Sequence, residues 1–499
     1  MDTGQAVSPK LGARSVRGGA LVALSSYATI LFGVVATIAL TRILSSEHFG
    51  IFTLAAFYAG LFNLRTKIGV GFAFAQRPAT TGEMMGTYLT LDITASLLSL
   101  ALALVAAPLM LYLRVSRDVV LVMVALSVIT VIEGTYLMAG VLLDKALYFG
   151  RNTLLTALSM PLSYIPAFIL AWRGAGYWSL YAQALTQSVI VAVGTWWVCR
   201  RLLTEPWQVR WRFDRKVAKE LLGFGLTLGV GSLAALLTTQ YDNFLIGTLV
   251  GVGVLGFYDR AYRIAGWPNL LITNIVARTV FYTYARLQSD IARLSRAFTM
   301  TLWLITASAI PLALVIFATA PDLVALLYGE RWLASVVFLR LLVVFSLLRP
   351  LLEDIYSLLT AIGQPKLVSL LYWFHAGVLI LVATPLTLWR GAVGTAVGVG
   401  IAFAAGVALA YILIKRFIAV PLSRTFGPPA LAALVALAVY YALQQWTAWH
   451  QLLPLNRLLL TGSAIGLSFY GALLLVSPRQ LIGNAATIWR LLRTGEGTS

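Results

Sequence analysis

Long apolar stretches separated by short polar loops follow one another along almost the whole chain. Because a helix needs about 20 apolar residues to cross the hydrocarbon core of a bilayer, each stretch predicts one membrane span. The first run is longer than the core of about 7–15 residues in a signal peptide, so we expect it to be retained. The fourteen predicted spans lie near residues 18–44, 50–76, 84–112, 118–143, 152–172, 176–199, 220–249, 255–285, 294–320, 333–362, 366–388, 392–414, 425–446 and 456–476. The fold class is therefore an all-α polytopic membrane protein.

Composition agrees with this class and excludes others. Hydrophobic residues make up 60% of the 499 and charged residues 11%, whereas soluble domains average about 25% charged residues. The net charge of +19 is spread over many short loops, so we expect no nucleic-acid binding surface. The single cysteine, Cys199, excludes an internal disulfide, and no histidine cluster stands near it to form a metal site.

The basic residues of the loops predict the orientation. Loops on the side of the N-terminus carry 23 Lys and Arg, and loops on the opposite side carry 7. Cytoplasmic loops of membrane proteins are enriched in these residues, so both termini are expected in the cytoplasm. The longest inner connection, residues 200–219, mixes arginines with Trp207 and Trp211. We expect it to lie at the membrane surface and contact anionic lipids.

Two short sequence repeats indicate that the chain contains two similar halves. Residues 42–52 resemble residues 248–258, and the tetrapeptide W-R-G-A occurs at 172–175 and again at 389–392. These offsets of 206 and 217 residues pair spans one to six with spans seven to twelve. Two like bundles with a site between them are typical of alternating-access transporters. The predicted domains are an N-terminal bundle (1–217), a C-terminal bundle (218–416) and two further helices with a tail (417–499).

Thirteen ionisable residues fall inside predicted spans. Unpaired in lipid they would cost roughly 30–45 kcal/mol, more than the net stability of about 5–15 kcal/mol of a whole domain. A hydrated cavity is therefore expected around them. They are Arg65, Lys67, Asp92, Glu133, Asp242, Asp259, Arg260, Arg263, Arg278, Arg340, Arg349, Glu353 and Asp354.

The seven cations predict an anionic substrate, because arginine forks bind phosphate or carboxylate oxygens well. The candidate substrate-binding residues are Arg65, Lys67, Arg260, Arg263, Arg340 and Arg349. Asp242, Asp259, Glu353 and Asp354 are the candidates for ion coupling or charge pairing. An alternative is that Asp259 with Arg263, and Arg349 with Glu353, are i,i+4 ion pairs that neutralise each other. That alternative leaves Arg65 and Lys67 without an obvious partner.

Several chemistries are not expected. Gly251, Gly253 and Gly256 spell G-x-G-x-x-G, but no strand precedes them, so they predict a helix hairpin rather than a dinucleotide site. There is no phosphate-binding G-x-x-x-x-G-K-[ST] sequence, so the chain is not expected to use ATP. Coupling to protons or sodium is the remaining energy source. Neither a long outer loop nor a soluble catalytic domain is predicted, so the protein is not expected to be an enzyme.

Several segments resemble one known family. They include L-G-F-Y-D-R-A-Y-R-I-A-G-W-P (255–268), V-F-Y-T-Y-A-R-L-Q-S-D (280–290), L-L-Y-G-E-R-W (326–332) and A-I-G-Q-P-K (361–366). These segments are similar to Wzx-like flippases of O-antigen and exopolysaccharide repeat units, of the colanic-acid and succinoglycan type. That family belongs to the superfamily that also contains the multidrug and toxin extruders.

The resemblance implies a function. It implies fourteen helices, two pseudo-symmetric lobes and a cationic cavity in the bacterial inner membrane. It also implies that the protein moves an oligosaccharide on undecaprenyl pyrophosphate from the inner to the outer leaflet. A polymerase and glycosyltransferases of the same pathway would be its partners. The alternative is a cation-coupled multidrug extruder, for which a cavity richer in carboxylates and aromatic residues is expected.

Overall fold

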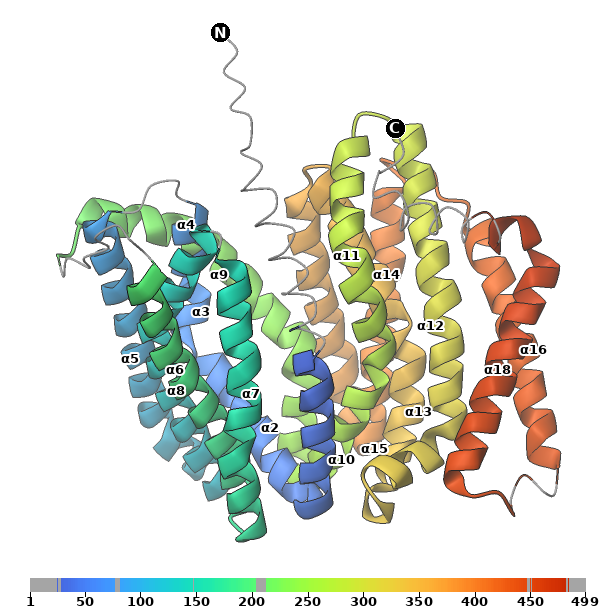
Figure 1. The fold of residues 1–499 in the computed structure, drawn as a ribbon, viewed down its shortest axis with the longest axis horizontal. Helices are drawn as coiled ribbons and strands as arrows, with labels where there is room; N and C mark the ends of the chain where they lie inside the picture. Colours follow the sequence, from blue (N-terminus) through green and yellow to red (C-terminus); the bar gives the residue numbers. More distant parts are fainter. Residues whose placement is uncertain are drawn as a thin grey trace. The chain divides into compact units, whose positions relative to one another are not determined.

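The computed structural model describes residues 25, 28–76, 81–146, 148–202, 212–446, 449, 451–481 and 483, and every regular element among them is a helix. The chain divides into two compact units, Met1–Gly256 and Phe257–Ser499. Each unit is a bundle of long helices built from the apolar stretches of the sequence (Figure 1). Each of the fourteen predicted spans coincides with helical structure in most of its described residues.

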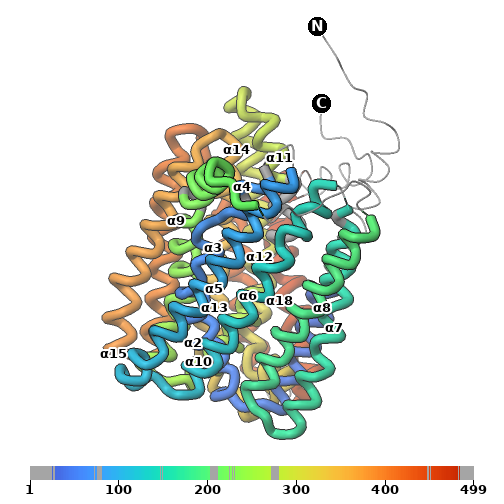
Figure 2. The backbone as a smooth tube through the Cα atoms, turned by 90° about the vertical axis from the view of Figure 1, so that its left-hand side faces the viewer, coloured from blue at the N-terminus to red at the C-terminus, as the bar shows by residue number. Residues whose placement is uncertain are grey.

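Unit 1 contains the first half of the helices. In this unit α7 and α8 lie side by side, and α6 packs between α5 and α8 (Figures 1 and 2). Its helices are Ala28–Ile43, α2 (Ser46–Phe62), α3 (Leu64–Ile68), α4 (Val70–Gln76), α5 (Gly82–Tyr112), α6 (Arg117–Lys145), α7 (Phe149–Trp172), α8 (Trp178–Leu202), α9 (Arg215–Leu245), the π-helix η1 (Ile246–Val250) and the start of α10 (Val252–Ala265).

Unit 2 contains the remaining helices. Its last two long helices, α16 and α18, pair with each other and with α12. Its helices after α10 are α11 (Trp267–Leu287), α12 (Ile291–Leu327), the 3-10 turn η2 (Glu330–Trp332), α13 (Ser335–Ser346), α14 (Leu348–Ala361), α15 (Pro365–Ile414), α16 (Leu422–Gln445) and α18 (Pro454–Val476). The glycine of W-R-G-A, Gly391, has φ +60° and divides α15 into the two predicted spans.

The helices that carry charges differ from the others. Within the described residues, nine helices are long and apolar enough to cross a membrane. The predicted spans 50–76 and 255–285 are not among them, because each is broken into shorter helices, α2, α3 and α4 in one and α10 and α11 in the other. Span 333–362 is one of the nine, with a single-residue interruption at Leu347 between α13 and α14, where φ and ψ stay helical. The expectation of a continuous helix in spans 50–76 and 255–285 is therefore wrong. Each break lies within about ten residues of a buried or half-buried arginine. Hydropathy alone could not show where these breaks occur.

Glycines on α9 allow the backbone of α3 to approach closely. A Cβ atom on Gly229 would overlap the carbonyl oxygen of Lys67, and one on Gly225 would overlap that of Ile68. Such a close approach is what a G-x-x-x-G spacing favours, and Gly394 and Gly398 pack in the same way within α15. Because α9 packs on α3 and α4, it lies in unit 1. The predicted domain boundary at residue 217 concerns the sequence repeat and stays a prediction.

The two repeated hairpins pack against each other reciprocally. A Cβ on Gly50 would overlap the carbonyl oxygen of Val252, and a Cβ on Gly256 would overlap that of Ser46. With the offset of 206 residues, Gly50 corresponds to Gly256 and Ser46 to Val252. Such a reciprocal contact is what a twofold axis between two like segments produces. In both copies of W-R-G-A, moreover, the glycine has positive φ, 79° at Gly174 and 60° at Gly391.

Candidate functional site

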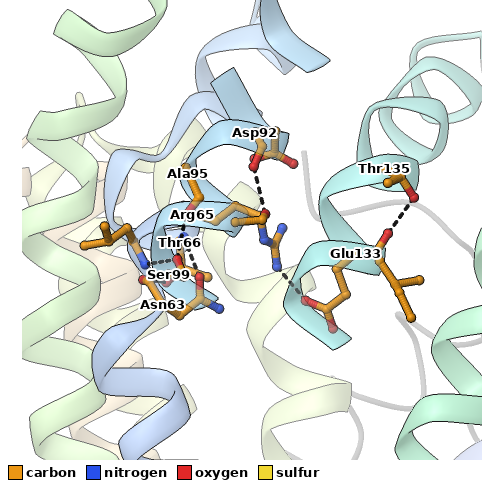
Figure 3. Close-up of polar contacts among 11 residues, drawn as sticks. Asn63, Arg65, Thr66, Asp92, Ala95, Ser99, Glu133 and Thr135 are labelled. Atoms are coloured by element: carbon orange, nitrogen blue, oxygen red, sulfur yellow. Dashed lines mark hydrogen bonds and ion pairs between the residues drawn. The ribbon is translucent and has the colours of Figure 1, made fainter. Parts of the chain in front are cut away.

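Local sequence explains the short helix that carries Arg65 and Lys67. Asn63 ends α2 and caps α3, since its Oδ1 accepts a hydrogen bond from the Thr66 N–H at 3.3 Å. The Leu64 N–H donates to Ser99 Oγ of α5 at 2.8 Å. Gly69 then ends α3 with φ +57°. Arg65 is thus presented from a single helical turn inside a broken span (Figure 3).

Arg65 forms an ion pair with a different helix. Its Nη2 donates to Glu133 Oε2 on α6 at 2.6 Å, across 68 residues of sequence. The Arg65 side chain is 10% exposed and that of Glu133 is 35% exposed. Figure 3 shows Arg65 extending from α3 toward Glu133, with Asp92 of α5 beside it. This pair links α3 to α6 of unit 1.

Two polar atoms of this cluster are not satisfied. Arg65 Nε and Asp92 Oδ2 are buried and have no hydrogen-bond partner in the structure. The Asp92 residue is only 3% exposed. Unpaired buried polar atoms are rare in native proteins and require an additional partner such as a water or a ligand. The cluster therefore has a free donor and a free acceptor close to an arginine.

Lys67 behaves differently from Arg65. Its Nζ donates to the carbonyl oxygen of Leu61 in the last turn of α2. The sequence offered neither Arg65 nor Lys67 an obvious partner, whereas the structure supplies one for each. Both partners were missed for a physical reason. Glu133 lies on a distant helix, and the Leu61 carbonyl is free to accept only because α2 ends nearby.

In unit 2, two arginines of α10 share one carboxylate of the same helix. Asp259 Oδ2 accepts from Arg263 Nε at 3.1 Å and from Arg260 Nε at 3.0 Å. Arg260 Nη2 contacts the same oxygen. Arg260 is 3% exposed, while the Arg263 side chain is 58% exposed. The alternative of an i,i+4 pair between Asp259 and Arg263 is therefore present in the structure.

The second local pair is present too, beside a pocket. Arg349 Nε lies 3.0 Å from Glu353 Oε1, and Arg349 Nη1 donates to the Tyr262 hydroxyl at 3.3 Å. Arg349 and Tyr262 line a pocket with Gly266 and Asn269, at the level of the breaks after α10 and α13. These two local pairs balance charge, but Arg349 also keeps contact with a cavity.

The other candidates have separate surroundings. Asp354 is 6% exposed and accepts from the Tyr284 hydroxyl at 3.1 Å. Arg340 Nε donates to the Phe317 carbonyl at 3.4 Å and lies over the Phe317 ring. Asp242 is buried and its Oδ1 accepts from the Asn243 N–H. The side chain of Arg278 and the residues 203–211 of the predicted interfacial connector lie outside the described part.

The structure thus brings only some of the candidates together: in unit 2, Asp259 lies with Arg260 and Arg263, and Arg349 with Glu353. In unit 1, Arg65 lies with Glu133 and Asp92, two acids that the sequence placed in spans but not in the site. The need to balance the cations of the first repeat was the sequence signal that could have added these two acids to the candidate site. The expectation that cations of both halves converge on one cavity stays a prediction. Among the described residues no group of three His, Cys, Asp or Glu could hold a metal ion.

Known proteins resemble the chain in sequence. Residues 39–337 match the family described as polysaccharide biosynthesis protein. Teichuronic acid biosynthesis protein TuaB of Bacillus subtilis (strain 168) is 27% identical over 315 residues, 63% of this chain and 64% of that relative. The chain therefore spans slightly less than two thirds of TuaB. Lipopolysaccharide biosynthesis protein WzxC of Escherichia coli (strain K12) is 22% identical over 348 residues, 70% of each chain. Succinoglycan biosynthesis transport protein ExoT of Rhizobium meliloti (strain 1021) is 25% identical over 350 residues, 68% of each.

Solved structures show the same fold. The lipid II flippase MurJ in an inward closed conformation superposes with a TM-score of 0.70 at 16% identity, covering 92% of this chain and 99% of that one. An inward-facing multidrug resistance MATE family transporter superposes with a TM-score of 0.58 at 15% identity, covering 78% and 95%. At such identities the likeness shows the fold alone. Because the family match covers more than half of the sequence, the chain belongs to the polysaccharide biosynthesis protein family.

Proposed function

We propose that the protein translocates an oligosaccharide repeat unit linked to undecaprenyl pyrophosphate from the inner to the outer leaflet by alternating access. The product serves the synthesis of O-antigen, capsule or exopolysaccharide. In this proposal the protein is a transporter of the bacterial inner membrane with cytoplasmic termini, and it performs no covalent chemistry. The polymerase and glycosyltransferases of the pathway are its functional partners.

The relatives and the fold support the transport class. WzxC, ExoT and TuaB are named for the synthesis or transport of surface polysaccharides, and MurJ is named as a lipid flippase. A multidrug extruder is the alternative, but the likeness to the MATE transporter concerns the fold only.

The observation that carries the proposal is the incompletely satisfied Arg65. This arginine lies in a helical turn of a broken span, pairs with a carboxylate on another helix, and keeps a buried Nε without a partner. A guanidinium forms charge-assisted, two-pronged hydrogen bonds with phosphate oxygens. A pyrophosphate can therefore replace Glu133 as the partner of Arg65, which would couple substrate binding to separation of α3 from α6.

Ion coupling requires a carboxylate that changes its protonation between states. Among the candidates, Asp259 already neutralises two arginines, and Glu353 pairs with Arg349. Asp354 instead accepts from a neutral tyrosine hydroxyl and has no ion pair in the described structure. We infer that Asp354 is the best candidate for the coupling proton or sodium ion, ahead of Asp242, Asp259 and Glu353.

A reconstituted flipping assay tests the proposal. Proteoliposomes would contain the full chain and a fluorescent undecaprenyl pyrophosphate oligosaccharide, and dithionite would bleach the label in the outer leaflet. We expect the protein to make the protected pool accessible, at a rate that Arg65→Gln strongly lowers. The same vesicles would be loaded with a cationic dye. Efflux of the dye without lipid translocation would contradict the flippase and identify an extruder.

A further inference from the structure

Unit 2 contains a pocket far along the chain from the candidate residues above. It lies where the first turns of α12 and α16 meet the segments that follow α15 and α18. We call it the α12–α16 pocket, and it is lined by residues that include Arg296, Thr299, Trp303, Arg424, Thr425 and Gln480. None of these residues belongs to the predicted transport site.

Trp303 gives this pocket an unsatisfied donor. The residue is 5% exposed, and its indole Nε1 is buried without a hydrogen-bond partner in the structure. An indole N–H can only donate a hydrogen bond. Since buried donors normally have a partner, this N–H beside the pocket lacks an acceptor.

The remaining polar groups favour an acceptor with negative charge. Arg296 and Arg424 line the pocket, and no acidic residue among those the structure describes does. The Thr299 hydroxyl donates to the Ser295 carbonyl and the Thr425 hydroxyl to the Pro421 carbonyl, at 2.7 and 2.9 Å. These hydroxyls therefore offer no free donor of their own. The pocket also lies at the N-terminus of the 24-residue α16, whose exposed N–H groups and dipole attract anions.

The position of the pocket along α12 and α16 places it at the membrane surface. α12 has 37 residues and so is about 55 Å long, against about 30 Å of hydrocarbon. Arg296 lies in its second turn, on the side that the basic residues predict to be cytoplasmic. Met300 lines the pocket, and Leu431 and Leu434 farther along α16 are exposed. An anionic head with attached acyl chains fits this combination.

We propose that the α12–α16 pocket binds the phosphate headgroup of an anionic membrane phospholipid, with Arg296, Arg424 and the Trp303 N–H as donors. The bound lipid holds the first turns of α12 and α16 together on the cytoplasmic side. This proposal does not depend on which substrate the protein transports.

Lipid binding to the delipidated full-length protein in detergent tests it, with phosphatidylglycerol, phosphatidylcholine, undecaprenyl phosphate and inorganic phosphate as probes. We expect phosphatidylglycerol to raise the thermal midpoint and to stay bound in native mass spectrometry. Arg296→Gln with Arg424→Gln should weaken this binding by about tenfold or more, because two charge-assisted hydrogen bonds are lost. Trp303→Phe keeps an aromatic side chain but removes the N–H, and it should weaken the binding severalfold.

Lys415→Gln with Arg416→Gln is the matched control, since it removes two exposed cations near the end of α15 and outside the pocket. It should leave the affinity unchanged. Equal binding of phosphatidylcholine, or an unchanged affinity of the pocket variants, would overturn the proposal. So would equal stabilisation by inorganic phosphate, or by undecaprenyl phosphate alone. The comparison of lipids on the unmodified protein decides the question even if a variant does not fold.

Discussion

The second span of each repeat is broken, and its arginines are neutralised in two different ways. In the first repeat, Arg65 of α3 pairs with Glu133 of α6, across 68 residues of sequence. In the second repeat, Arg260 and Arg263 share Asp259, which belongs to the same helix α10. A pair within one helix survives any movement of that helix. A pair between helices holds only while α3 and α6 keep their positions.

This difference suggests a division of labour between the two breaks. The charges of the α10 cluster stay balanced when α10 moves, since its two arginines and its carboxylate belong to one helix. The Arg65 cluster changes whenever α3 moves relative to α6, and it already has unsatisfied atoms on Arg65 and Asp92. We therefore expect the α10 cluster to matter most for stability and the Arg65 cluster to matter most for transport.

The largest stability effect is expected at Asp259. Asp259→Asn removes the carboxylate that Arg260 contacts through Nε and Nη2, while Arg260 stays 3% exposed. Breaking a buried ion pair on one side costs about 3–5 kcal/mol. The free energy of unfolding, measured by denaturant titration in mixed micelles, should fall accordingly. Asp259→Asn with Arg260→Met should recover part of the loss, and equal stability of the single variant and the original chain would refute this role.

Arg65→Met should have a smaller effect on stability and a larger one on transport. Glu133 is 35% exposed and can be solvated after the change, so we expect a stability loss of about 1–3 kcal/mol. Flipping should fall by roughly tenfold to a hundredfold if Arg65 binds pyrophosphate, as one or two charge-assisted hydrogen bonds are lost. Arg263→Met is the control, because Arg263 is 58% exposed and Arg260 still contacts Asp259. A greater loss of flipping in Arg263→Met would reverse the assigned roles.

The sequence could predict the ion pairs that form within a single helix. Asp259 with Arg263, and Arg349 with Glu353, are four residues apart on helices, so helical geometry alone brings them together. The spans and their loops followed from hydropathy. The G-x-x-x-G spacing of the α9 glycines is visible in the sequence, although their partner, the backbone of α3, is not.

The ion pair between helices depends on tertiary packing and could not be predicted from the sequence. The ion pair of Arg65 with Glu133 depends on how α3 and α6 are placed, and no local pattern encodes that placement. The breaks at Asn63 and Gly69 lie inside an apolar run, and a hydropathy average does not detect them. Asn63 next to two cations was a local signal that this span is interrupted, because asparagine favours helix caps over helix interiors.

The two breaks also differ in how tightly their glycines are packed. Gly229→Ala would force a Cβ against the backbone carbonyl of Lys67, which cannot move away as a side chain can. We expect a loss of about 1–3 kcal/mol in unfolding free energy, together with slower flipping. Gly266→Ala, at the other break, meets only the Tyr262 and Arg263 carbonyl oxygens of its own helix, at 3.4 and 3.6 Å. It should change stability by less than about 0.5 kcal/mol, and a large loss there would show that this break is packed as tightly as the first.

The smallest stability effect is expected at Arg349 and Glu353. Their side chains are 35% and 31% exposed, so a double-mutant cycle of Arg349→Gln and Glu353→Gln should give a coupling below about 1 kcal/mol that weakens with salt. Arg349 nevertheless lines a pocket with Tyr262. If Arg349→Gln slows flipping while Glu353→Gln does not, Arg349 binds the substrate in addition to pairing with Glu353. If both variants flip at the original rate, charge balance alone accounts for Arg349, and transport in this family member depends on the cross-helix cluster of Arg65.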